Sequence, residues 1–176
     1  MAESLSTKWG KRLGRGLKGM GPNDRLAATG ALVVIGSLVL PWYGAPIASD
    51  LVQTGMGAFS FATAAMLLTV AAVLFLVFEV GDGYRPPRPL TVGALLIAGG
   101  FWISLIVIYQ MIARPEFNFA GIEDSYGLRY GSFVALGGAA AMILAGTRRR
   151  VREMAGQAAH ADDHLDDLEG LDDDDD

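Results

Sequence analysis

His160 and His164 are the residues whose spacing most resembles that of a chemical site. Two imidazoles four positions apart on one helix face can bind a zinc ion. Both histidines lie beside a strongly acidic run, where such a spacing arises easily by accident. The sequence has no other histidine, so no serine or threonine elsewhere has an imidazole partner for nucleophilic catalysis. The HExxH and GxSxG motifs and the phosphate-binding glycine loop are also absent.

Carboxylates in two polar connections are the other candidates for chemistry. Asp50 lies in one connection, and Glu116, Glu123 and Asp124 lie in the other. Two such acids could act as general acid and base, or hold a divalent ion through oxygen ligands. Loop carboxylates are usually solvated or paired, and Arg114 and Arg129 lie nearby. We therefore expect no catalytic residue, no metal and no cofactor, and a protein that is not an enzyme.

The elements that would position these residues are four long apolar stretches, approximately 24–43, 58–79, 90–113 and 127–146. A hydrocarbon core about 30 Å thick needs about 20 apolar helical residues to cross it, and each stretch meets that length. Of all residues 52% are apolar and only 19% are charged, and no polar face interrupts the stretches at helical spacing. The predicted fold is all-α, a transmembrane four-helix bundle over residues 23–147. Cysteine is absent, so no disulfide is expected.

Positive charge predicts the orientation of these stretches. Twelve of the fourteen Lys and Arg residues precede or open the first stretch, lie between the second and third, or follow the fourth. The positive-inside rule then places both termini in the cytoplasm, in a multi-pass protein of the cell (plasma) membrane. A cleavable secretory signal ending near Ile47–Ser49 is the alternative. Against cleavage, the leader is long, and Pro41, Trp42 and Tyr43 resemble an interfacial anchor.

Residues 1–22 form a basic arm. Leu5, Trp9, Leu13 and Leu17 recur every four residues, so a helix here would lie in the membrane interface. The residues expected to contact lipid headgroups are Lys8, Trp9, Lys11, Arg12, Arg15 and Lys18. The arm's glycines favour the alternative, a mobile topology signal, because each glycine costs a helix about 1 kcal/mol relative to alanine. No nucleic-acid reader motif accompanies the charges, so nucleic acid is not an expected partner.

Small residues follow regular spacings in the second and fourth stretches. The expected helix-packing residues are Ala58, Ala62, Ala65, Thr69 and Ala72 in the second, and Gly127, Gly131, Ala135 and Ala139 in the fourth. Such rows let helix backbones approach closely in lipid. They would serve either packing within the chain or contact with another subunit. Trp102, near the middle of the third stretch, is expected to pack against a neighbouring helix.

Residues 148–176 are expected to form a basic stop followed by a disordered acidic tail. Asp162 to Asp176 include ten acidic residues and no basic one, a composition typical of disorder. Leu165, Leu168 and Leu171 interrupt the acidic residues at three-residue intervals, so one apolar edge could dock on a partner. The alternative is a solubilising tail that repels other acidic surfaces.

Three short motifs carry a family resemblance. Leu40 to Tyr43 are Leu-Pro-Trp-Tyr, Gly57 to Phe61 are Gly-Ala-Phe-Ser-Phe, and Arg85 to Pro89 form a proline-rich connection. In these features the chain resembles small four-span integral membrane proteins of high-GC Gram-positive bacteria. The resemblance implies a four-helix membrane protein and supplies no activity.

The absence of ionisable side chains deep inside the stretches bears on function. Such residues are usually functional in membranes, so a proton-coupled transporter is not expected. The features favour a non-enzymatic scaffold or accessory subunit of a membrane complex, in contact with lipids and with a protein partner or further copies of itself. The alternative is an oligomeric channel or transporter component for a small solute, with a pore lined from the Ser104 and Gln110 side of the third stretch.

Overall fold

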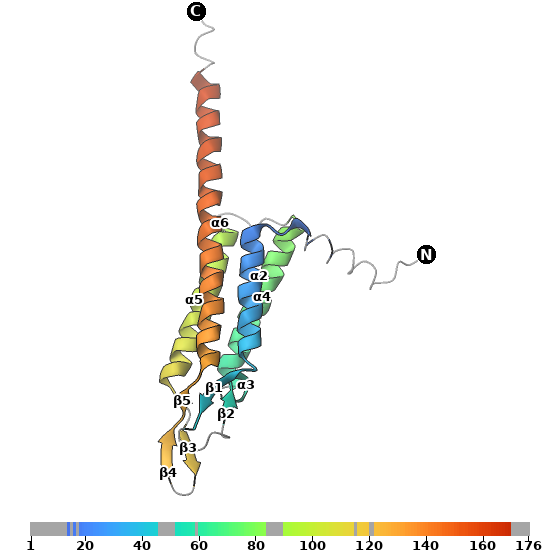
Figure 1. The fold of residues 1–176 in the computed structure, drawn as a ribbon. Coiled ribbons are helices and arrows are strands. Elements are labelled where there is room, and N and C mark those ends of the chain that lie inside the picture. Colours follow the sequence, from blue (N-terminus) through green and yellow to red (C-terminus); the bar gives the residue numbers. More distant parts are fainter. Residues whose placement is uncertain are drawn as a thin grey trace, which may run out of the picture.

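Four long helices form a bundle with short strands at one end (Figure 1). A computed structural model describes residues 14, 16, 18–45, 52–58, 60–83, 90–114, 116–119 and 122–169. The long helices are α2 (Pro22–Ser37), α4 (Ser60–Gly81), α5 (Val92–Ile112) and α6 (Tyr130–Glu169), and α3 (Gly55–Ala58) is one turn. The strands are β1 (Pro41–Gly44), β2 (Val52–Thr54), β3 (Glu116–Phe119), β4 (Ile122–Ser125) and β5 (Gly127–Leu128).

Three helices contain a segment long and apolar enough to cross a membrane: Phe61–Gly81, Val92–Ile112 and Tyr130–Ala155. The prediction of apolar helices of spanning length is therefore confirmed for the second, third and fourth stretches. The first stretch differs from its expected range, because α2 has 16 residues and rises only about 24 Å. Pro41 lacks the N–H that a continuing helix would use, and β1 begins there. The strands are a second departure from the all-α expectation.

Helix α6 is the centre of the bundle, because α2 and α5 both pack on it more extensively than on any other helix. Glycines permit the close approach. A β-carbon added at Gly138 of α6 would lie 2.7 Å from the carbonyl oxygen of Gly30 in α2. On the α5 side, a β-carbon at Gly146 would lie 2.7 Å from the carbonyl oxygen of Gly93. Backbone meets backbone at both crossings, as in membrane helix pairs.

Helix α4 packs differently from the other helices. One narrow row of buried residues holds it to the bundle, at three- and four-residue spacing: Thr63, Met66, Val70, Val73 and Val77. Large apolar side chains cover the rest of its surface, with Leu68 73% exposed and Phe75 67% exposed. Its contacts with α2 and α5 are few compared with those of α6. Most of α4 therefore faces the surroundings of the bundle.

The strands join the ends of the helices. β1 pairs antiparallel with β2 and with β5, and the pair Gly44 and Gly127 links the segment after α2 to the segment before α6. β3 and β4 form a separate antiparallel hairpin. Gly127 therefore lies in a strand, which corrects its expected place in the packing row of the fourth stretch. The helix starts at Tyr130, three residues later.

Helix α6 continues to Glu169 and extends beyond the other helices (Figure 1). The expected basic stop lies within α6, and the helix reaches Glu169, inside the acidic tail that was expected from Asp162. Arg, Glu, Met, Gln and Ala predominate between Arg148 and Ala161, and these residues have high helix propensity. Leu165 and Leu168 fall on this extension, while Leu171 lies outside the described residues, as does the remainder of the acidic tail.

Candidate functional site

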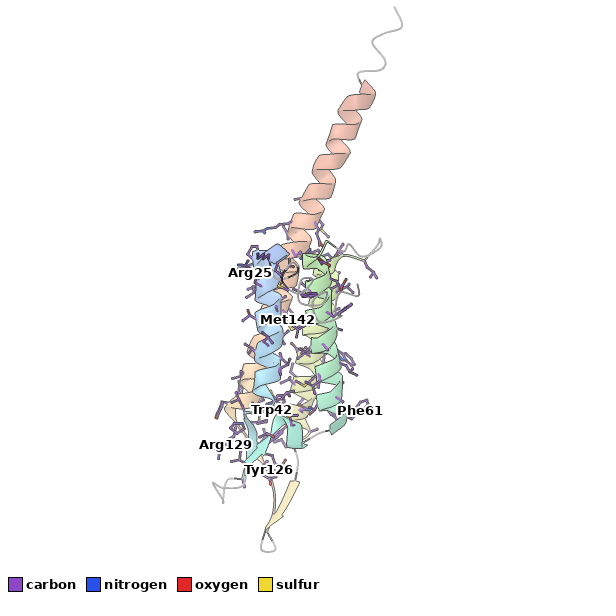
Figure 2. All side chains as sticks on the ribbon, turned by 90° about the vertical axis from the view of Figure 1, so that its right-hand side faces the viewer. Arg25, Trp42, Phe61, Tyr126, Arg129 and Met142 are labelled. Carbon is purple, nitrogen blue, oxygen red and sulfur yellow. The ribbon has the colours of Figure 1, made fainter. Side chains whose placement is uncertain are left out.

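Two buried aromatic residues, Trp42 and Tyr126, lie at the strand end of the bundle and are called the aromatic cluster. Trp42 is completely buried, and its Nε1 donates a hydrogen bond to the carbonyl oxygen of Ser37 at 2.7 Å. Gly55 and Gly131 leave room for the indole: a β-carbon at Gly131 would lie 2.5 Å from Trp42 Cδ1. Figure 2 shows Trp42, Tyr126 and Arg129 at this end, with Arg25 at the opposite end. Trp42 is thus a packing residue of the bundle, not the interfacial anchor expected from the sequence.

Tyr43 and Gln110 form a polar pair beneath this cluster. The Tyr43 hydroxyl donates to the backbone carbonyl oxygen of Gln110 at 2.7 Å. The Gln110 side chain is 1% exposed, and neither its Oε1 nor its Nε2 has a hydrogen-bond partner among the described residues. An amide can donate and accept hydrogen bonds but does not transfer protons. The pair could hold a small polar molecule, because the Gln110 side chain is buried within this chain.

The Tyr43 phenol gives a pH-dependent prediction. Burial raises its pKa from 10.0 to about 12, and the Arg114 charge lowers it in part. The folded chain therefore holds this proton more tightly than the unfolded chain. Stability from this group is complete below pH 10 and falls as pH rises toward 12. The tyrosinate absorbance difference between the native chain and Tyr43→Phe should titrate with a midpoint near 12. A midpoint near 10.0 would show that the phenol is solvated.

A charged network links three helices at the other end of the bundle. Arg149 Nη1 of α6 bonds to Asp24 Oδ1 of α2, and the Asp24 side chain is only 8% exposed. Arg149 Nε donates to Glu153 Oε1 at 3.1 Å, and Glu153 Oε2 accepts from the Gly93 N–H of α5 at 3.4 Å. A pocket of about 310 Å³ borders the network and includes Arg152. The charges are mutually paired, so the network fixes helix positions and offers no free base.

Asp24 and Arg149 lie 125 positions apart, and sequence reasoning missed them. A local signal for Asp24 existed: it follows Gly21 and Pro22 as the third residue of α2, and its Oδ2 accepts from the Gly21 N–H at 3.2 Å. This is the arrangement of a carboxylate that caps a helix start. Arg149 had no such signal, because it is one of three consecutive arginines.

A groove lies between α4 and α5, with a volume of about 610 Å³. The residues that line it are Thr69, Ala72, Val73, Phe75, Leu76, Glu79, Leu95 and Gly99. Seven of these eight are apolar or carry only a hydroxyl, and Glu79 is the one charged residue among them. The groove arises because α4 touches the bundle along a single row.

Comparison with protein-family models, with curated proteins and with solved structures finds no match for this chain. Function is therefore inferred from the arrangement of its own residues. Within the described part of the chain, no group of three or more His, Asp or Glu side chains is placed to hold a metal ion.

The expected packing residues occupy different environments. In α6, Gly131, Ala135 and Ala139 are buried on the sides that meet other elements. In α4, Ala62, Ala65 and Thr69 are half-buried and Ala72 is exposed. Ala58 belongs to the one-turn helix α3 and not to α4, and its side chain lies outside the described residues. The α4 row therefore runs beside the buried row of that helix, and Thr69 and Ala72 line the groove.

The residues expected to contact headgroups fall almost entirely outside the described part of the chain. Lys18 is described and is exposed, whereas Lys8, Trp9, Lys11, Arg12 and Arg15 are not described. Two nearby glycines approach the end of α4: Gly16 is buried beside the Phe78 ring, and Gly19 is exposed but lies close to the Gly81 carbonyl oxygen. Trp102 is 52% exposed, so other parts of this chain cover only about half of its side chain.

Proposed function

We propose that this chain is a multi-pass protein of the cell membrane that serves as a non-enzymatic accessory or scaffold subunit. In this proposal α2, α4, α5 and α6 are the four spans, and the end of the bundle that carries Asp24 and Arg149 faces the cytoplasm. Arg25 and the basic residues 148–152 lie at that end, in agreement with the positive-inside rule. The turn at Leu38–Leu40 and the aromatic cluster extend α2 toward the opposite surface.

The observation that carries the proposal is an apolar row on α6 that begins at the end of the bundle, beside Glu153, and continues along the extension. Val151 is 67% exposed and Met154 is 52% exposed, although both are large apolar residues next to charged ones. The row continues at alternating spacings of three and four residues, through Ala158, Ala161, Leu165 and Leu168. This is the heptad spacing of a helix that packs along another helix.

The surroundings of this row indicate the partner. Asp162, Asp163, Asp166 and Asp167 occupy other positions of the same extension. Two copies of this segment side by side would bring like charges together, which is unfavourable. A partner helix with an apolar row and flanking Lys or Arg residues would instead be complementary in charge. We therefore expect the extension to recruit a cytoplasmic or membrane-bound protein with a basic amphipathic helix.

Crosslinking in membranes tests this function. The double variant Val151→Gln, Met154→Gln should lose a crosslinked partner that the native chain retains. Ala155→Gln is the matched control, because Ala155 is exposed on the same segment but lies off the row. The bundle should be unaffected in both variants, since none of the three side chains is buried. A native chain recovered only as a monomer, or crosslinked only to itself, would contradict the proposal.

A further inference from the structure

We infer that the groove between α4 and α5 binds one acyl chain of an inner-leaflet phospholipid whose headgroup carries an ammonium group. The inference rests on the membrane placement proposed above. It concerns a ligand site in the bundle and is independent of the α6 extension and its partner.

The length of the groove selects an acyl chain over a partner helix. The lining residues of α4 run from Thr69 to Glu79, and ten residues of helix rise about 15 Å. That length is half of a hydrocarbon core about 30 Å thick. A partner helix that crosses the membrane would need a groove along the whole of α4, but among the described residues the lining of α4 starts at Thr69. The groove therefore spans one leaflet, which is the length that an acyl chain occupies.

The chemistry of the lining agrees with this occupant. Ala72 and Gly99 are small and therefore leave space within the groove. Val73, Leu76 and Leu95 form its apolar walls. The polar group at the deep end of the groove is the Thr69 hydroxyl, which donates to the Ala65 carbonyl oxygen at 2.8 Å. Because this hydrogen bond is already made, the hydroxyl does not require a polar ligand. A β-carbon at Gly99 would lie 2.9 Å from Val73 Cγ2, so the two helices touch at the floor of the groove.

Glu79 lies at the other end of the groove, two residues before the end of α4. At that depth a phospholipid presents its headgroup. A carboxylate accepts hydrogen bonds from several donors at once, so an ammonium group can be added to its existing surroundings. A headgroup without an ammonium group cannot add this contact. The groove should therefore prefer phosphatidylethanolamine to phosphatidylglycerol.

Native mass spectrometry of the full chain, extracted from bilayers with equal amounts of these two lipids, tests the inference. The native chain should retain one phospholipid, predominantly phosphatidylethanolamine. Ala72→Phe fills the groove and should lose that lipid. Ala71→Phe is the matched control, because Ala71 is an exposed neighbour on the same helix that does not line the groove, and it should keep the lipid.

Glu79→Gln separates the acyl site from headgroup selection. This variant should keep a lipid but lose about fivefold in its preference for phosphatidylethanolamine, the effect of an exposed ion pair of about 1 kcal/mol. Equal lipid retention by Ala72→Phe and Ala71→Phe would overturn the acyl site, and an unchanged preference in Glu79→Gln would overturn the headgroup contact. Release of the native chain from membranes by alkaline carbonate would instead contradict the membrane placement itself.

Discussion

Replacing Gly138 with valine should lower the free energy of unfolding by about 3 kcal/mol, the cost of overfilling a tightly packed site. The β-carbon would lie 2.7 Å from the Gly30 carbonyl oxygen and 2.9 Å from Val34 Cγ2. Neither neighbour can move independently, because one is backbone and the other is a completely buried side chain. The helices α2 and α6 would have to separate, and the Asp24–Arg149 contact farther along the same pair would separate with them.

Gly137→Val is the control for this experiment. Gly137 is exposed on the same helix, and a β-carbon there meets nothing within 4 Å. The change in helix propensity is the same at both positions, so only the packing differs. Unfolding in mixed detergent micelles, followed by circular dichroism, compares the two variants. Equal losses of stability in both would show that the close crossing of α2 and α6 contributes little.

Arg149→Gln is the second change with a large expected effect. It leaves the Asp24 carboxylate, only 8% exposed, without its cationic partner. Removing one member of a buried ion pair typically costs 3–5 kcal/mol, and because Arg149 is itself 20% exposed we expect about 3 kcal/mol. The contact of Arg149 with Glu153 would be lost as well. The same unfolding measurement reports the effect.

Two further variants isolate the ion pair. Arg148→Gln removes the same charge from an exposed neighbouring position and should change stability little. Adding Asp24→Asn to Arg149→Gln removes the uncompensated carboxylate and should recover part of the loss, which a double-mutant cycle would quantify. A loss in Arg148→Gln as large as that in Arg149→Gln would mean that net charge at this end matters and the pair does not.

The extents of the central helices could be predicted from the sequence because apolar length is a local property. The expected ranges 58–79 and 90–113 differ from α4 and α5 by one or two residues at each end. The same local reasoning could have ended the first helix before Pro41, whereas the expected range ran to residue 43 and α2 ends at Ser37. The strand pairing of Gly44 with Gly127 joins segments far apart in sequence, so no local pattern announced it.

Packing partners were harder to predict than helices. Alanine and glycine occur throughout the apolar stretches, so a regular row of them does not reveal which face meets a neighbour. Gly30 and Gly146 take part in the close crossings, yet neither belonged to an expected packing row. Trp42 shows the same limit: its burial depends on Gly55 and Gly131, which approach it from other elements. Shape complementarity of this kind exists only in the folded chain.

The central place of α6 also determines when the bundle can form. α6 is the last of the long helices to emerge from the ribosome, and it supplies the surface on which both α2 and α5 pack. A nascent chain that stops before Tyr130 holds its earlier helices without the element that joins them. Assembly of the bundle is thereby postponed until α6 has been made, and products truncated before this helix should be recognisable to quality-control proteases by their unassembled helices.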